Sequence, residues 1–367
     1  MKKLAFFSTQ WEEGSPALHL LDRSLNGWPS NGRMKEKPFE TISVYGHQAE
    51  KHLGERRKHP HLKVEKSIEK AIADADAWIL AAGANNNWAC CSQYLFSAIK
   101  LAPKSTRGFI VGFPTGLGTQ QFEELIKADV NRIQVSTPLP WTWRLPETDI
   151  PSGAKLDEAV ILIRGKFPTA EQEAMDALLA LTSHRQGGES GIKKITRWTG
   201  NDVWKAARER RFSWDLFSAA VSRTNSKQGD AHIDGRTQDI VGLGKIPQLA
   251  KGTRAWVINH KDGLQSTIIT VDGILNDDNF AVRTHSGEIF SAQFYRPPKP
   301  HDHQYSRLMD RISSYLIEAK NTLPRQRTQL WVNTIQMMQS MEKDNLSTVE
   351  VPDDGLRYAL PNSTWTP

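Results

Sequence analysis

Apolar runs and amphipathic stretches alternate along the first 140 residues of the chain. The short apolar or alternating runs predict buried strands, at residues 4–7, 39–45, 77–81, 108–111 and 133–135. Helical spacing of apolar residues fills the intervals, at residues 16–25, 67–72, 92–101 and 119–127. Ser15 and Pro16 are the residue types expected at the start of the first helix. Alternation of this kind is typical of an open parallel sheet, so we predict a Rossmann-like domain over residues 1–138.

The pattern changes after a segment rich in proline and tryptophan, residues 136–153. We therefore place a second, α+β domain at residues 139–367. Its apolar pattern predicts a strand at 156–164 and a helix at 169–181, then two hairpins around Lys261-Asp262-Gly263 and Ser286-Gly287. Further helices are expected, at residues 201–220, 305–318 and 326–339. This order predicts an open, mainly antiparallel sheet with helices on one face.

Composition narrows the class of protein. The 367 residues are 38% hydrophobic and 24% charged, which suits two globular domains. We expect a cytoplasmic protein without a membrane partner, because the apolar start is too short for a signal peptide and no run reaches the ~20 residues of a span. The net charge of the chain is +6, and residues 51–66 form a basic stretch. This stretch contains no aromatic residues for base stacking, so we expect no nucleic-acid partner. Two adjacent cysteines, Cys90 and Cys91, make a poor metal site.

Four segments carry a resemblance to a known family: "STQWEEGS", "PLPWTWRLP", "GGESGIKKITRWTGNDVWKA" and "DGLQSTIITVDGILNDDNFAVR". Together they resemble the Gfo/Idh/MocA family of glucose–fructose oxidoreductases and inositol dehydrogenases, over nearly the whole chain. The resemblance implies an NAD(P)-dependent oxidoreductase for a sugar or polyol derivative, and a homo-oligomer formed through the second sheet. Two alternatives stay open: a cofactor-free ligand-binding or partner protein, and a sugar lyase or hydrolase on the same scaffold.

The turn after the first strand is where the family holds its dinucleotide. It contains a single glycine, whereas the usual turn has several that let the backbone approach a pyrophosphate. Glu12 and Glu13 add negative charge there. The candidate cofactor contacts are the residues around this turn and one beyond the second predicted strand: Ser8, Thr9, Gln10, Gly14, Ser15 and His47. The pattern leaves open whether NAD, NADP or no dinucleotide binds.

The expected catalytic lysine is absent. Phe113-Pro114 stands where the family has Lys-Pro, so any activity needs another acid or base. Glu173 and Asp176 are three residues apart on a predicted helix and share a face, and such a pair can divide acid and base roles. The alternative is an acidic stripe on an amphipathic helix.

Candidate substrate contacts come from two segments. Trp141 and Arg144 lie at the predicted domain boundary, where clefts favour ligands and aromatic faces suit sugar rings. The alternative is that the tryptophans have a purely packing role. His232 and Arg236 lie in a polar loop, residues 229–239, which could line a sugar site or form a mobile surface loop. No metal site is predicted, because the paired histidines of 301–303 have no evident third ligand.

Overall fold

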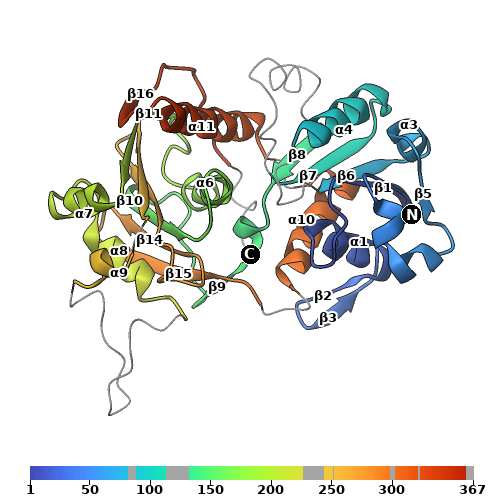
Figure 1. Ribbon diagram of the computed structural model, residues 1–367, viewed down its shortest axis with the longest axis horizontal. Coiled ribbons are helices and arrows are strands. Elements are labelled where there is room, and N and C mark those ends of the chain that lie inside the picture. Colours follow the sequence, from blue (N-terminus) through green and yellow to red (C-terminus); the bar gives the residue numbers. More distant parts are fainter. Residues whose placement is uncertain are drawn as a thin grey trace, which may run out of the picture. The chain divides into compact units, whose positions relative to one another are not determined.

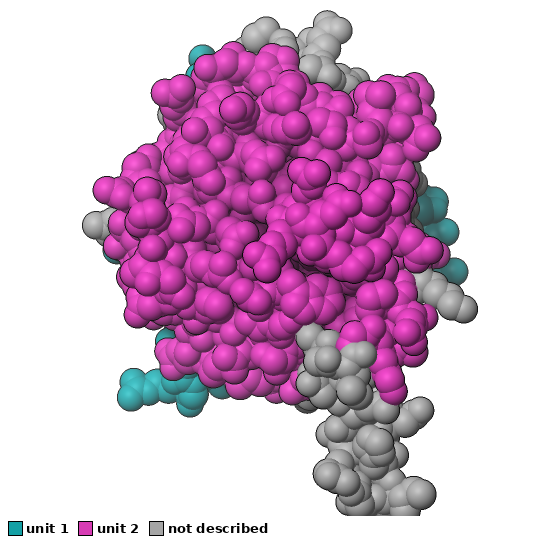
Figure 2. All heavy atoms as spheres, turned by 90° about the vertical axis from the view of Figure 1, so that its left-hand side faces the viewer, with its two compact units in different colours: residues 1–141, 297–325 teal, residues 142–296, 326–367 magenta. Residues whose placement is uncertain are grey.

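The computed structural model describes residues 1–81, 88–112, 132–225, 244–250, 252–297, 302–320 and 323–360. The chain forms two compact units, coloured separately in Figure 2. The first unit joins residues 1–141 with 297–325, and the second joins residues 142–296 with 326–367. The predicted second domain, residues 139–367, includes 297–325. These residues belong to the first unit because their helix packs on its sheet and its first helix.

The first unit is built on a six-stranded parallel sheet (Figure 1). Its strands run in the order β5-β4-β1-β6-β7-β8. They are β1 (Lys2–Ser8), β4 (Phe39–Tyr45), β5 (Lys63–Val64), β6 (Ala77–Ala81), β7 (Arg107–Val111) and β8 (Ile133–Ser136). The five predicted strands are confirmed, with β5 in addition. The strand order changes direction at β1, so the switch point lies between β1 and β6, where ligands of such sheets bind.

Helices and one hairpin complete the first unit. The helices are α1 (Pro16–Asn26), α2 (Ala49–His52), α3 (Ile68–Ile72), α4 (Trp88–Leu101) and α10 (Gln304–Glu318), with 3-10 turns η1 (Gly54–Lys58) and η3 (Leu139–Trp141). The hairpin pairs β2 (Trp28–Ser30) with β3 (Arg33–Lys35). The predicted start of α1 is confirmed, since Ser15 accepts a hydrogen bond from the Leu18 amide and Pro16 opens the helix. On α10, buried Tyr315 packs edge-on against Phe109 of β7 at 6.2 Å between ring centroids.

The second unit contains an eight-stranded mixed sheet in the order β16-β11-β12-β13-β10-β14-β15-β9. All neighbours are antiparallel except β10 and β13, which are parallel. The strands are β9 (Trp143–Leu145), β10 (Leu156–Ile163), β11 (Ile192–Thr199), β12 (Arg254–His260), β13 (Gln265–Thr270), β14 (Asn279–Thr284), β15 (Ile289–Tyr295) and β16 (Thr348–Glu350). The two predicted hairpins are β12/β13 and β14/β15, and the mainly antiparallel sheet is confirmed.

Helices cover both faces of this sheet, whereas the sequence predicted one (Figure 1). On one face lie α6 (Thr169–Thr182) and α11 (Arg325–Lys343), and on the other α7 (Asn201–Arg208), α8 (Trp214–Val221) and α9 (Ile246–Leu249). The physical reason is that β10 is apolar on both sides: Val160 and Leu162 join the core beneath α7 and α8, and Ile161 between them is also buried. No helix in the described ranges is long and apolar enough to cross a membrane.

Candidate functional site

The first candidate site is the edge of the parallel sheet where β1, β4 and β6 end. Ser8, the last residue of β1, is fully buried. Its hydroxyl donates a hydrogen bond to the Ala81 carbonyl oxygen at 2.8 Å and accepts one from the Gln10 amide at 3.0 Å. Ser8 therefore ties the ends of β1 and β6 together and starts the turn, so its hydroxyl is already used by the fold.

Trp11 fills the inside of this turn. Its side chain is 1% exposed and lies against Phe6, with 5.9 Å between ring centroids. Gly46, directly after β4, makes room for it, because a Cβ at Gly46 would stand 1.8 Å from the Ser8 carbonyl oxygen and 2.7 Å from the Trp11 indole nitrogen. The turn is therefore packed with an indole at the place where a glycine-rich turn leaves space for a ligand.

The start of α1 is the place where a Rossmann-type fold would hold a pyrophosphate. An anion binds at a helix N-terminus through backbone N–H groups that have no other partner. Pro16 has no N–H, and Ser15 accepts from two of the other amides of the first turn: its hydroxyl from Leu18 at 3.3 Å and its carbonyl from His19 at 3.1 Å. The Ser15 amide in turn donates to the Glu12 carbonyl at 3.0 Å. The turn therefore leaves few amide donors for the pyrophosphate of a dinucleotide.

The remaining cofactor candidates form the rim of the same edge. Thr9 and Gln10 are half-buried, and the side-chain amide of Gln10 donates to the Glu12 carboxylate at 3.0 Å. Gly14 is exposed and has φ +78°, which shapes the turn. His47 is exposed in the connection after β4. The structure thus gathers Ser8–Ser15 around one turn, with His47 beyond the neighbouring strand.

Arg56 lies near this rim, and its guanidinium forms ion pairs with carboxylates. Its guanidinium makes two bonds to Asp22, at 2.5 and 2.8 Å, and lies 3.6 Å from Glu13. The hydrogen bond to Asp22 is the main reason that the pKa of Arg56 is raised. A phosphate at this point would have to displace the Asp22 carboxylate from the guanidinium.

In the second unit, Glu173 belongs to a network of ion pairs at the ends of β10 and β15. Arg296 lies 2.8 Å from Glu173 and 2.9 Å from Asp278, and Arg164 lies 3.3 Å from Asp278. Asp278 is almost fully buried. Arg164 and Arg296 also line a cleft of about 280 Å³, together with Tyr295. Glu173 is therefore connected through Arg296 to a small polar cleft.

Asp176 lies in different surroundings from Glu173. Its side chain is fully buried and forms an ion pair with Arg327 of α11, which is also fully buried. Arg327 donates a second hydrogen bond to the Asp176 carbonyl oxygen at 2.8 Å. The structure does not bring the two carboxylates together: one binds Arg296 beside a cleft, and the other fastens α6 to α11. Asp176 has no access to a substrate in this conformation.

Glu171, two residues before Glu173, is a buried carboxylate that was not predicted from the sequence. It is fully buried and lies 2.7 Å from Arg254 of β12. Burial raises the pKa of Glu171, although Arg254 opposes that effect. The Arg254 guanidinium also stacks 5.0 Å from the Phe167 ring. In the sequence Glu171 is one of three acidic residues on an amphipathic helix, and nothing local distinguishes it.

Three further residues, which no sequence pattern indicated, are arranged like the serine, histidine and acid of a hydrolase triad. The Ser266 hydroxyl lies 2.9 Å from Nε2 of His260, whose Nδ1 lies 3.0 Å from Glu189. All three side chains are buried, and Arg185 contacts the Glu189 carboxylate at 3.0 Å. Burial alone would raise the pKa of Glu189, but His260 and Arg185 outweigh it and lower that pKa. With no exposed nucleophile, this arrangement holds β12, β13 and the 185–191 turn together.

The predicted substrate contacts lie in separate surroundings. Trp141 is buried in the first unit, where its indole donates to the Ser136 hydroxyl at 2.8 Å and Arg311 stacks on it at 5.0 Å. Arg144 packs in the second unit, 4.7 Å from the Phe294 ring. Three other residues of interest lie outside the described residues: Phe113, His232 and Arg236. Within the described ranges, no three His, Cys, Asp or Glu side chains come together to hold a metal ion.

The fold of the two units is that of the Gfo/Idh/MocA dehydrogenases. No family model and no curated protein matches the sequence. Among solved structures, myo-inositol dehydrogenase from Lactobacillus casei, in complex with NAD(H) and myo-inositol, matches with TM-score 0.60 and 9% identity over 100% of both chains. A myo-inositol dehydrogenase from Corynebacterium glutamicum matches with TM-score 0.57 and 10% identity, covering 96% of this chain and 99% of that one. Biliverdin reductase from Synechocystis, in complex with biliverdin and NADP+, reaches 0.52 at 9% identity, over 92% and 98%.

Proposed function

We propose that this chain is an oxidoreductase of the Gfo/Idh/MocA type that acts on a sugar or polyol derivative, with NAD or NADP. One observation carries the proposal: the whole two-unit architecture matches an inositol dehydrogenase that binds NAD(H) and myo-inositol, over the full length of both chains. The switch point between β1 and β6 is where such sheets bind a dinucleotide. A small sugar-like molecule is the proposed substrate, and Glu173 and Arg144 are proposed contacts on the second unit.

The β1–α1 turn limits what is assigned to the cofactor. Pro16 and the self-capping Ser15 leave few amide donors for a pyrophosphate, and Trp11 occupies the interior. Thr9, Gln10, Gly14 and His47, which form the rim, stay proposed as cofactor contacts, and no step of hydride transfer is assigned to them. Biliverdin reductase shares the fold, so the substrate class rests on the inositol dehydrogenases.

A cofactor-free ligand-binding or partner protein is the second candidate. The specific observation in its favour is the indole of Trp11, which a dinucleotide in the usual position would have to displace. The lyase or hydrolase alternative has less support, because Glu173 and Asp176 are held in separate ion pairs. The homo-oligomer also stays a prediction. It was expected to form through the sheet of the second unit, and helices of this chain cover parts of both faces of that sheet. Light scattering measures it directly.

The deciding experiment is native mass spectrometry of the purified chain, titrated with NAD(H) and NADP(H). Binding at or below 1 mM supports the oxidoreductase, and Glu12→Gln should then tighten it, because removing a carboxylate at the turn reduces repulsion of the pyrophosphate. Asp74→Asn is the matched control, since Asp74 is exposed just before β6 at the opposite edge of the sheet. No binding of either dinucleotide, together with an unchanged melting temperature, favours the second candidate.

A further inference from the structure

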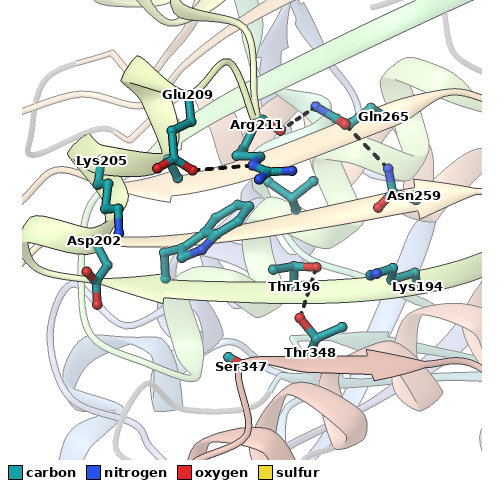
Figure 3. A pocket seen from close by; sticks show the side chains of 13 residues that line it. Lys194, Thr196, Asp202, Lys205, Glu209, Arg211, Asn259, Gln265, Ser347 and Thr348 are labelled. Carbon is teal, nitrogen blue, oxygen red and sulfur yellow. Dashed lines mark hydrogen bonds and ion pairs between the residues drawn. The ribbon is translucent and has the colours of Figure 1, made fainter.

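A polar groove lies on the second unit, on the side of the sheet that carries α7 and α8. We call it the α7 groove. Its floor is formed by β11, β12 and β13, and its sides by α7 with the residues after it and by the start of β16. Its volume is about 560 Å³, within the usual range for small-molecule sites. Figure 2 looks at the second unit from this side, and Figure 3 shows the groove from close by.

Strand register places one row of polar side chains across the floor. Lys194 of β11 is opposite Asn259 of β12, and Asn259 is opposite Gln265 of β13. Thr196 and Trp198 follow Lys194 at alternate positions, so they point to the same side of the sheet. All five side chains are half-buried, which means that they are open to the groove and still supported by the sheet.

The floor is polar at one end and apolar at the other. Trp198 is partly buried against the core beneath α7 and α8, and Val257 and Ala206 border the groove beside it. An indole surface next to a row of amides suits a sugar ring, which has an apolar C–H face and a rim of hydroxyl groups. A purely ionic ligand would not use the apolar end.

Hydrogen bonds fix the polar end. The Gln265 side-chain amide donates to the Arg211 carbonyl at 3.0 Å, and its oxygen accepts from the Asn259 amide at 3.4 Å (Figure 3). Glu209 lies 3.5 Å from the Arg211 guanidinium. Each amide is thus held in one orientation before any ligand arrives, which reduces the entropy lost on binding.

The charges around the groove are mixed. Lys194, Lys205 and Arg211 are positive, and Asp202 and Glu209 are negative. A nucleic acid requires a predominantly basic surface, so this balance argues against it. Carboxylates and amides that accept, beside cations and amides that donate, match the hydroxyl groups of an uncharged sugar, which both donate and accept.

From these observations, we propose that the α7 groove is a binding site for a neutral oligosaccharide, separate from the sheet edge of the first unit. Sugar rings stack on Trp198, and their hydroxyl groups bind Lys194, Asn259 and Gln265. The proposal does not depend on a dinucleotide, because no residue of the groove belongs to the first unit. Its role is to hold a glycan, with no chemistry at this site.

The test is a binding screen of the full chain against uncharged trisaccharides: maltotriose, cellotriose, xylotriose, mannotriose and chitotriose. Saturation-transfer NMR identifies binders, and isothermal titration gives their Kd. We expect at least one Kd below about 1 mM, weakened at least tenfold by Trp198→Ala and by Gln265→Ala. Gln265→Ala removes only a half-buried polar side chain, so this variant is expected to fold. It therefore keeps the test valid if Trp198→Ala fails to fold. Lys193→Ala is the control, because Lys193 is exposed and points to the other side of β11.

Three results overturn the proposal. The first is the absence of binding by all five trisaccharides. The second is binding that the groove variants leave unchanged, which would place the sugar elsewhere. The third is conversion of a dimer into a monomer by Trp198→Ala, which would make the groove an interface between copies of this chain. None of these outcomes affects the dinucleotide titration.

Discussion

Replacing Glu189 by glutamine is the sharpest test of what holds the second sheet together. The Glu189 carboxylate is fully buried and accepts three hydrogen bonds: from Arg185 at 3.0 Å, from the Gly191 amide at 2.9 Å and from His260 at 3.0 Å. Glu189→Gln keeps the size of the side chain and removes its charge. The new NH₂ group then meets either the Arg185 guanidinium or the Gly191 amide, donor against donor.

The expected cost follows from these contacts. A hydrogen bond to a charged group contributes about 1.5–3 kcal/mol, and removing one partner of a buried ion pair costs about 3–5 kcal/mol. Arg185 keeps its second partner, Asp262, at 2.7 Å, which reduces the loss. We therefore expect Glu189→Gln to lower the free energy of unfolding by about 3 kcal/mol at pH 7. Asp262→Asn should cost only about 1 kcal/mol, because Asp262 is partly exposed.

The effect depends on pH in a defined direction. His260 and Arg185 lower the pKa of Glu189 below that of an unfolded glutamate, against the opposing effect of burial. The stabilising contribution is therefore complete above the unfolded pKa of about 4.3 and decreases as the pH falls below it. Glutamine does not titrate, so the difference between wild type and Glu189→Gln should shrink in acid.

Urea unfolding at pH 7 and at pH 4 measures both quantities, with hydrogen exchange of the β12 and β13 amides as a local readout. Two compact units need not unfold together, so the local readout assigns the change to the second unit. Equal midpoints for wild type and Glu189→Gln at pH 7 would refute the reasoning. So would a difference that grows as the pH falls.

Three further predictions concern other closely packed positions. Asp176→Asn should lower the free energy of unfolding by about 3 kcal/mol, because it breaks an ion pair between two fully buried side chains. If Asp176 were an acid or base, the variant would instead lose turnover with its stability intact, and a urea titration beside an activity assay separates the two outcomes. Gly46→Ala should destabilise the first unit by at least about 2 kcal/mol, visible in calorimetry, since its Cβ would stand 1.8 Å from the Ser8 carbonyl oxygen; an unchanged melting temperature would contradict the packed turn. Trp141→Phe removes one buried indole hydrogen bond and should cost about 1 kcal/mol in the same calorimetric scan, whereas a weakened ligand with unchanged stability would point to a binding role.

Local sequence signals predicted most of the elements. Ser15 and Pro16 define the start of α1 through a side-chain cap and a fixed φ, both of which act within a few residues. The glycines of the two hairpins, Gly263 and Gly287, have φ of +97° and +91°, as their turns require. The predicted helix at 201–220 is instead two helices, because Ser213 caps α8 and Arg210 adopts φ +56° between them.

What the sequence did not indicate depends on contacts between distant residues. Glu189 and His260 are 71 positions apart, and nothing near either of them shows that they meet inside the sheet. Trp11 stands in a polar turn, and its burial follows from the space that Gly46 leaves after β4. The polar row of the α7 groove likewise exists only once β11, β12 and β13 pair in register.

The return of residues 297–325 to the first unit has a consequence for synthesis and for protein engineering. Each unit is made of two stretches that alternate along the chain, so neither is complete in any contiguous fragment. A truncation at residue 141 would lack α10 and leave the apolar surface around Phe109 bare. During translation, the first unit cannot be completed until residue 325 has left the ribosome. By then most of the second unit has already emerged. Separate expression of either half should therefore give insoluble material, and a soluble first unit requires a short linker that replaces residues 142–296.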